Sequence, residues 1–304
     1  MNPVLFVFLL SALPPSAQQA PGTPPAAQPA QTPQPVQGDS NRSVIKPKPG
    51  QEALKEKDLY DRTGYLHPFR RMPKFILYDQ KAIWTSPFHT SKQNAKWWAI
   101  WGVTIGGLIA SDRYIQRDAP NNATLVRVGN DASYLGEVYT LLPIAAGMYF
   151  IGTSHGSDHF RETGLLSFEA LANVGIMDLV LKSALGRERP TDGKGNGAFQ
   201  QSPNRVNSSF PSGHTISTFA LASVVAHEYH HHTWVKALIY GYGIGVGAAR
   251  LAANKHFPSD VVAGGVMGWF VGDYVYGKRH NSELDKKSTA QTILSHITIG
   301  GAIN

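Results

Sequence analysis

The feature that most constrains the fold is a series of six apolar segments, each long enough for several helical turns. They are rich in Ala, Gly, Leu, Ile and Val, and polar stretches separate them. The segments cover residues 95–110, 134–152, 165–185, 214–229, 235–252 and 260–276. Apolar runs of this length, without alternation of polar and apolar positions, are typical of buried helices rather than strands. We therefore predict an all-α fold, a helical bundle of about six core helices.

One of these segments has a second interpretation. Alternate positions from Gly241 to Gly247 are glycine, a period that also fits a strand. The run continues into Ala248-Ala249-Arg250-Leu251-Ala252, which favours a helix. We expect a helix whose small residues let neighbouring helices approach closely.

The flanking regions divide the chain further. Residues 1–38 contain no charged side chain, and their apolar start resembles a secretory signal with a cleavage site near Ala17, although Lys and Arg are missing at its beginning. A disordered tail is the alternative. The predicted organisation is a signal peptide at 1–17, a Pro/Ala/Gln-rich linker at 18–38, an N-terminal arm at 39–94 with an interfacial helix as one option, a catalytic helical domain at 95–280 and a C-terminal tail at 281–304.

Whether the helices cross a membrane stays open at this level. The uncharged stretch Trp97–Ser111 is shorter than the ~20 residues that a spanning helix needs. Asp178 and Asp273 interrupt two further segments. A soluble exported bundle and a membrane-embedded bundle both fit. We expect an exported protein with membrane association as an option, located in the periplasm or in an inner membrane with an outward-facing site.

The charge balance restricts the partners. Lys and Arg number 28 against 21 Asp and Glu, which gives a net charge of +7 and favours anionic partners. Only 16% of residues are charged and no basic run occurs, so we expect no nucleic-acid partner. The chain has no cysteine, which excludes disulfides, thiol catalysis and zinc–cysteine sites.

Cations and small residues gather at the ends of the third, fourth and fifth predicted helices. Lys182, Arg189 and Arg250 supply three positive charges, enough to surround the non-bridging oxygens of a phosphoryl group. Ser212 and Gly213 begin a helix, so a hydroxyl and free backbone N–H groups are available to bind another oxygen. These five residues predict a phosphate-binding site.

Two histidines and a carboxylate accompany this site. His214 and His256 can divide two roles between them: one attacks phosphorus and the other protonates the leaving oxygen. Asp260 follows His256 by four residues and would hold one imidazole nitrogen if the stretch were a helical turn. Pro258 favours a turn instead, leading into the sixth predicted helix, which Ser259 or Asp260 would cap. Chemistry alone does not decide which histidine attacks.

The spacing of these residues resembles the three-part signature of the type 2 phosphatidic acid phosphatase and vanadium haloperoxidase superfamily. The parts are Lys182-x6-Arg189-Pro190, then Pro211-Ser212-Gly213-His214, then Arg250-x5-His256-x3-Asp260. The resemblance covers about residues 95–276. One position departs from it, since Ala249 stands where the family usually has Ser.

The resemblance implies a phosphatase that needs no metal or other cofactor and forms a phosphohistidine intermediate. It makes His256 the nucleophile, Asp260 its orienting partner and His214 the general acid. Lys182, Arg189, Arg250, Ser212 and Gly213 would bind the phosphoryl oxygens. The implied substrate is a phosphorylated lipid or a small soluble phosphomonoester. Vanadate could occupy the same pocket, which makes a vanadium-dependent haloperoxidase the runner-up function.

A third candidate function comes from a different motif. His227-Glu228-Tyr229-His230-His231 matches the H-E-x-x-H pattern of zinc proteases. Two histidines four apart on a helix can bind zinc, with the glutamate as base. The pattern lies at the end of an apolar segment, where a loop is expected, so we regard a surface histidine patch as the stronger interpretation. A helical binding protein with an inactive pocket is the non-enzymatic alternative.

Overall fold

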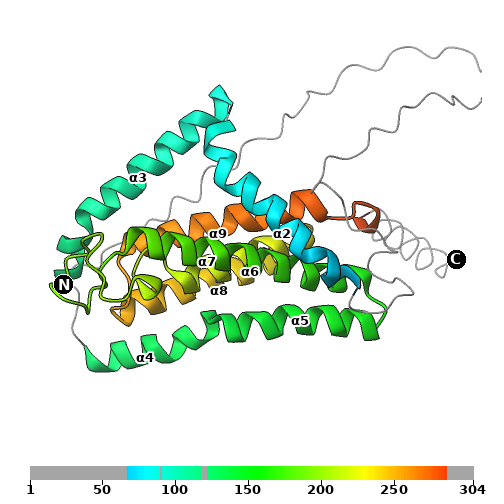
Figure 1. Cartoon of the computed structure of the whole chain (residues 1–304). Helices are drawn as coiled ribbons and strands as arrows, with labels where there is room; N and C mark the ends of the chain where they lie inside the picture. Colours follow the sequence, from blue (N-terminus) through cyan, green and yellow to red (C-terminus); the bar gives the residue numbers. More distant parts are fainter. Residues whose placement is uncertain (1–66, 90, 118–121, 286–304) are drawn as a thin grey trace, which may run out of the picture. The chain divides into compact units, whose positions relative to one another are not determined.

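The computed structural model describes residues 67–89, 91–117 and 122–285, and this part of the chain contains eight α-helices and no strand. The helices are α2 (His67–Thr85), α3 (Lys92–Arg117), α4 (Ala123–Ser133), α5 (Val138–Ser154), α6 (Asp158–Leu185), α7 (Gly213–Glu228), α8 (Thr233–Ala252) and α9 (Pro258–Arg279) (Figure 1). The all-α prediction is confirmed, and the glycine run lies inside helix α8. The predicted signal peptide and linker, most of the arm and most of the tail lie outside the described residues.

Helix α7 forms the centre of the bundle and packs against α6, α8 and α9. Its apolar residues Ile216, Ala220 and Val224 are fully buried. They belong to one core cluster together with residues of α6 and α9. A helix that is apolar all round needs neighbours on every side, which is why this short segment has the central position.

Two helices outside the predicted set complete the described bundle. Helix α4 packs against α8 and leads through a short 3-10 helix, Tyr134–Gly136, into α5. Helix α2 places Met72 and Phe75 in the core cluster. It was not recognised as a core helix because its apolar residues are separated by many charged ones.

A buried group of charges joins α2, α6 and α9. Arg279 Nη2 lies 2.9 Å from Asp79 Oδ1, and its Nε lies 3.1 Å from Glu169 Oε1. Asn173 donates a hydrogen bond of 3.1 Å to the other oxygen of Asp79. All four side chains are fully buried. Removing one partner from such a group typically costs about 3–5 kcal/mol, because the remaining charge loses its compensation.

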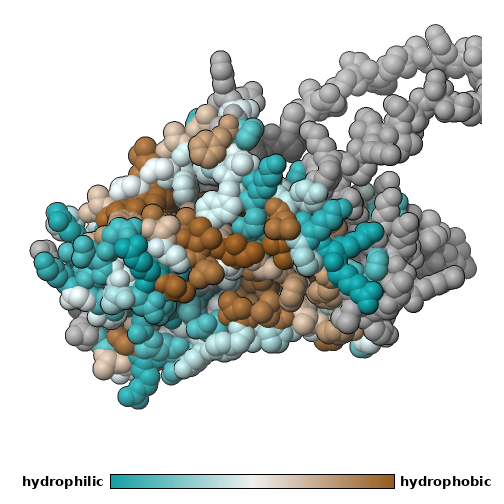
Figure 2. Space-filling model, in the orientation of Figure 1, coloured by the Kyte–Doolittle hydropathy of each residue, from teal (hydrophilic) through white to brown (hydrophobic). Residues whose placement is uncertain are grey.

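The outer faces of several helices are apolar. Figure 2 shows apolar residues gathered across the middle of the visible face, with hydrophilic residues toward its ends. Exposed large side chains include Val103 on α3, Phe150 on α5 and Leu179 on α6. Two helical stretches, Ala123–Ser154 and Asp158–Leu185, are long and apolar enough to cross a membrane by length and composition. Exposed apolar surface of this kind is typical of a protein that contacts lipid or another apolar partner.

The contact between α7 and α9 depends on glycine. A Cβ atom at Gly268 would lie 2.1 Å from the carbonyl oxygen of Ile216, whereas a Cβ at Gly277, farther along α9, would meet nothing within 4 Å. Only glycine lets the two backbones approach this closely.

We expect Gly268→Ala to lower the free energy of unfolding by about 1–3 kcal/mol, because the added methyl group forces the helices apart. Gly277→Ala is the matched control and should stabilise the protein by up to about 1 kcal/mol through helix propensity. Thermal unfolding followed by circular dichroism measures both. Equal effects of the two substitutions would show that the close contact does not limit stability.

Candidate active site

The predicted site residues meet at one end of the bundle. Helices α6 and α8 end there, and α7 and α9 begin there, so residues far apart in sequence come from neighbouring helix ends. Lys182 and Arg250 lie in the last turns of α6 and α8. His214 lies in the first turn of α7, and His256 in the loop before α9. The bundle thus presents a cluster of polar side chains on its helix ends and on the loops that join them.

Lys182 contacts the beginning of α7. Its Nζ lies 2.9 Å from Asp178 Oδ2, one turn earlier on α6. A Cβ atom at Gly213 would lie 2.9 Å from the same Nζ. Glycine at this position therefore lets the ammonium group reach the N-terminus of α7, where free backbone N–H groups also favour an anion. Asp178 was noticed in the sequence only as an interruption of an apolar segment.

Arg189 connects two loops by hydrogen bonds and has further N–H donors that these bonds do not use. Its Nε and Nη2 donate to the carbonyl and side-chain oxygens of Asn207, at 3.0 and 2.7 Å. Its Nη1 donates to the carbonyl oxygen of Lys255 at 3.1 Å. A guanidinium has five N–H donors, so two remain for an oxygen ligand.

His256 is buried, and a backbone carbonyl orients it. Its Nδ1 lies 2.8 Å from the carbonyl oxygen of Ser209. A carbonyl can only accept, so Nδ1 carries the proton and Nε2 keeps its lone pair. The nearest Asp260 oxygen lies 3.7 Å from Nδ1, too far for a hydrogen bond. The expected direct hydrogen bond between Asp260 and this imidazole is therefore not made, because Asp260 lies in the first turn of α9, which begins at Pro258, after His256.

Asp260 is connected to His256 through Ser209. Its Oδ2 accepts hydrogen bonds from the hydroxyl of Ser209 at 2.6 Å and from the backbone N–H of Phe257 at 2.8 Å. The carboxylate thus fixes Ser209, whose carbonyl holds His256. Ser209 was missed in the sequence because nothing about an isolated serine marks its backbone carbonyl as important.

Arg187, which the sequence analysis also passed over, is the cation that pairs with Asp260. Its Nη1 donates to Asp260 Oδ1 and to the hydroxyl of Ser259, and its Nη2 donates to Asp112 Oδ2 at 2.7 Å. The backbone N–H of Ser259 donates to Asp112 Oδ1 at 3.1 Å. All four residues are buried. Asp112 could have indicated such a pair in the sequence, because it directly follows an apolar run. A carboxylate that is buried together with such a run requires a partner of opposite charge.

His214 faces a carboxylate from another helix. Its Nε2 lies 2.9 Å from Oε1 of Glu137, the residue just before α5. Arg250 is buried, and its Nε has no hydrogen-bond partner among the described residues. The Ser212 hydroxyl lies 2.9 Å from the Thr215 hydroxyl rather than standing alone. Glu137 was not predicted, because it lies 77 residues before His214 and outside the three motifs.

The electrostatics of this end favour a bound anion. Burial lowers the pKa of His256 well below its usual value, and Arg189, Arg250 and Lys182 lower it further. Burial and then Arg250 lower the pKa of His214 to about 3. Both imidazoles are therefore neutral at pH 7 without a ligand. A phosphate dianion would offset the cations and raise both pKa values, which makes protonation of His214 depend on the bound anion.

The H-E-x-x-H pattern does not have the geometry of a zinc protease. Helix α7 ends at Glu228, so His227 and His231 are not four apart on one helix. His227 Nε2 lies 3.0 Å from Asp273 Oδ1 instead. The pattern also lies at the opposite end of α7 from His214.

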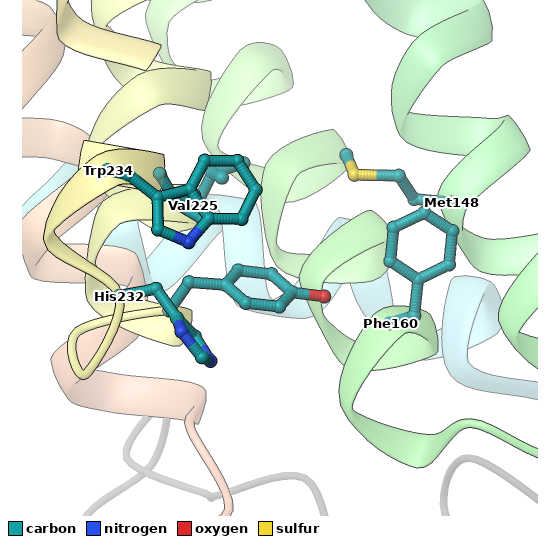
Figure 3. A pocket seen from close by; sticks show the side chains of 7 residues that line it. Met148, Phe160, Val225, His232 and Trp234 are labelled. Carbon is teal, nitrogen blue, oxygen red and sulfur yellow. The ribbon is translucent and has the colours of Figure 1, made fainter. Parts of the chain in front are cut away.

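An apolar pocket of about 400 Å³ lies near that opposite end. Figure 3 shows Val225 and Trp234 on one side of it and Met148 and Phe160 on the other. It is separated from the cationic cluster by nearly the length of α7, so it is not the candidate active site.

The comparison with protein families agrees with the motifs. Residues 163–283 match the family model described as PAP2 superfamily. This segment runs from the second turn of α6 to just after α9 and contains all eight predicted site residues. Residues 163–283 of the chain are thus similar to the PAP2 superfamily.

Curated relatives include two enzymes named lipid A 1-phosphatase. The protein from Porphyromonas gingivalis is 28% identical over 151 residues, which cover 49% of this chain and 31% of that protein. The protein from Rhizobium etli is 31% identical over 113 residues, which cover 35% of this chain and 47% of that protein. The match thus spans less than half the length of each relative.

Two solved structures are also similar. One is the crystal structure of Aquifex aeolicus LpxE, with 22% identity, a TM-score of 0.38 and coverage of 55% of this chain and 93% of that chain. The other is the first transmembrane PAP2 type phosphatidylglycerolphosphate phosphatase from Bacillus subtilis. It has 21% identity, a TM-score of 0.40 and coverage of 68% and 94%, respectively.

The lowered pKa of His256 can be tested directly. At pH 5.5 an ordinary histidine is about 90% protonated, because its pKa lies near 6.5. We expect His256 to remain neutral at pH 5.5, since it gains a proton only below its lowered pKa. Nitrogen-15 NMR of labelled imidazoles measures this, and the resonance missing in His256→Gln identifies the residue. An imidazolium signal for His256 at pH 5.5 would contradict the assignment.

Proposed function

We propose that this chain is a metal-independent phosphatase that hydrolyses phosphomonoesters through a phosphohistidine intermediate. The observation that carries the proposal is the hydrogen bond between His256 Nδ1 and the Ser209 carbonyl oxygen. It leaves Nε2 as a neutral nucleophile, while Lys182, Arg189 and Arg250 lower the pKa of the ring and attract the phosphate.

In the first step, His256 Nε2 attacks phosphorus and the bond between phosphorus and the ester oxygen breaks. His214 donates its proton to the departing oxygen, so the alcohol leaves neutral. The three cations stabilise the charge that spreads over the non-bridging oxygens in the transition state. Glu137, 2.9 Å from His214 Nε2, favours the protonated form of the acid.

In the second step, water attacks the phosphohistidine. His214, now neutral, takes a proton from the water as the new phosphorus–oxygen bond forms. The phosphorus–nitrogen bond then breaks, and inorganic phosphate and the starting form of His256 are restored. The same histidine thus acts as acid and then as base.

A lipid phosphate is the substrate class that fits best. The curated relatives are named for lipid A, and the exposed apolar faces of α3, α5 and α6 support membrane association. The phosphate of a lipid could enter the site at the polar end of the bundle while the lipid stays in its membrane. Export and a periplasmic or outward-facing site remain predictions from the N-terminal sequence.

We expect His256→Gln to lower phosphate release at least about 10³-fold, because it removes the nucleophile. The matched control is His231→Gln, in the loop between α7 and α8, which should keep the wild-type rate. Lipid A in mixed micelles and p-nitrophenyl phosphate serve as substrates, with the higher kcat/KM expected for the lipid. Acid quenching with ³²P-labelled substrate should trap a labelled chain in wild type and none in His256→Gln. Full activity of His256→Gln would overturn the mechanism.

The role of His214 predicts a dependence on the leaving group. His214→Gln should lower the rate about 10²–10⁴-fold for an alkyl phosphate, whose leaving oxygen needs a proton. The loss should be much smaller for p-nitrophenyl phosphate, because nitrophenolate leaves without protonation. Steady-state rates on both substrates measure the difference. Equal losses would show that His214 does not protonate the leaving group.

A further inference from the structure

A second cluster of ionisable side chains lies at the opposite end of the bundle. Glu162 is the fifth residue of α6, Glu228 is the last residue of α7 and His280 follows α9 directly. Lys182 is twenty residues beyond Glu162 on the same helix, so the two clusters are separated by about 30 Å. No role in phosphate chemistry explains this second cluster.

The donor atoms converge at the spacing of a metal site. His280 Nδ1 lies 3.0 Å from Glu162 Oε1 and 3.6 Å from Glu228 Oε1. One donor from each of the three residues lies within 4.8 Å of the others. Tetrahedral ligands at about 2.0–2.2 Å from an ion stand about 3.3–3.6 Å apart. The two distances from His280 Nδ1, 3.0 and 3.6 Å, are thus close to those of ligands that share an ion.

The surroundings orient these donors as they do in metal sites. His280 Nε2 lies 3.0 Å from Asp285 Oδ2, which directs the lone pair of Nδ1 toward the two glutamates. His159 Nε2 lies 3.0 Å from Glu228 Oε2 and can hold that carboxylate from behind. A carboxylate–histidine pair facing further carboxylates is a recurrent arrangement around zinc.

Two buried carboxylates meet in this cluster. Glu162 and Glu228 each lie within 4 Å of the His280 imidazole, and Glu162 Oε1 also accepts a hydrogen bond of 2.8 Å from the backbone N–H of Asn281. Glu162 is fully buried, and its Oε2 has no hydrogen-bond partner among the described residues. A buried unpartnered carboxylate oxygen is costly unless a cation or a donor compensates it.

Aromatic rings pack against both histidines. Tyr276 stacks on the His280 ring at 4.4 Å between centroids, and Tyr229 meets the His159 ring edge-on at 4.7 Å. Glu162 and Glu228 are themselves buried, which strengthens the attraction between these carboxylates and a cation.

We propose that Glu162, Glu228 and His280 bind one divalent transition-metal ion, with Zn²⁺ as the best fit. Mixed imidazole and carboxylate donors suit Zn²⁺ better than Mg²⁺ or Ca²⁺, which prefer oxygen alone. The ion joins the beginning of α6, the end of α7 and the segment after α9. It is structural and takes no part in the phosphate chemistry 30 Å away.

The test uses the full chain without a histidine tag, stripped by a chelator and then titrated. Calorimetry with Zn²⁺ alone should give one site per chain, and Co²⁺ should produce the visible absorption bands of a protein-bound ion. Glu228→Gln and Glu162→Gln should each weaken binding at least about 100-fold, whereas His231→Gln should leave it unchanged. Zn²⁺ at a hundredfold excess over Kd should raise Tm by about 5 °C or more.

Two outcomes would overturn the proposal. Wild-type protein without stoichiometric Zn²⁺ or Co²⁺ binding would mean that the cluster is held by ion pairs alone. Binding that survives both glutamate substitutions and disappears in His231→Gln would place the ion on the adjacent surface histidines. The Co²⁺ titration of wild type needs no variant, so it decides the first outcome even if a variant does not fold. The initial phosphatase rate of the stripped, folded protein should stay at the wild-type value.

Discussion

The candidate active site depends on the buried ion pair between Arg187 and Asp260. Arg187 lies just after the end of α6, and Asp260 lies in the first turn of α9. The pair therefore fixes the long loop after α6 against the start of α9. Asp112 extends the connection to α3. The free energy of the pair matters less than its directionality, since a guanidinium with fixed donors specifies one arrangement of the loops. Ser209 and through it His256 are positioned by that arrangement.

Much of the fold followed from the apolar pattern alone. Long runs without period-two alternation admit helices and little else, so the segments later seen in α3 and α5 to α9 were predicted close to their observed places. Helix α4 and the packing of α2 were not, because their apolar faces are narrow and broken by charged residues. In α2, Asp79 points into the core although it is charged. It can be buried there because Arg279 of α9 forms an ion pair with it.

The site was predicted as a set of residues but not as a geometry. Three motifs carry side chains whose chemistry suggests phosphate, and the fold brings them to one end of the bundle. The sequence could not reveal that a backbone carbonyl, that of Ser209, would take the place expected for Asp260 beside His256. Every residue has a backbone carbonyl, so residue type does not indicate which one will accept a functional hydrogen bond. Nor could it pair Glu137 with His214 or Asp112 with Arg187, since those contacts depend on tertiary packing.

The close contact of α7 with α9 has a consequence for motion. With Gly268 against the backbone of α7, neither helix can slide or rotate without a clash, so this side of the site behaves as one rigid body. The connection that carries Glu137 is also closely packed, because a Cβ atom at the neighbouring Gly136 would lie 3.3 Å from the Cβ of His214. Backbone packing therefore fixes the general acid and its carboxylate partner relative to each other, in addition to their ion pair.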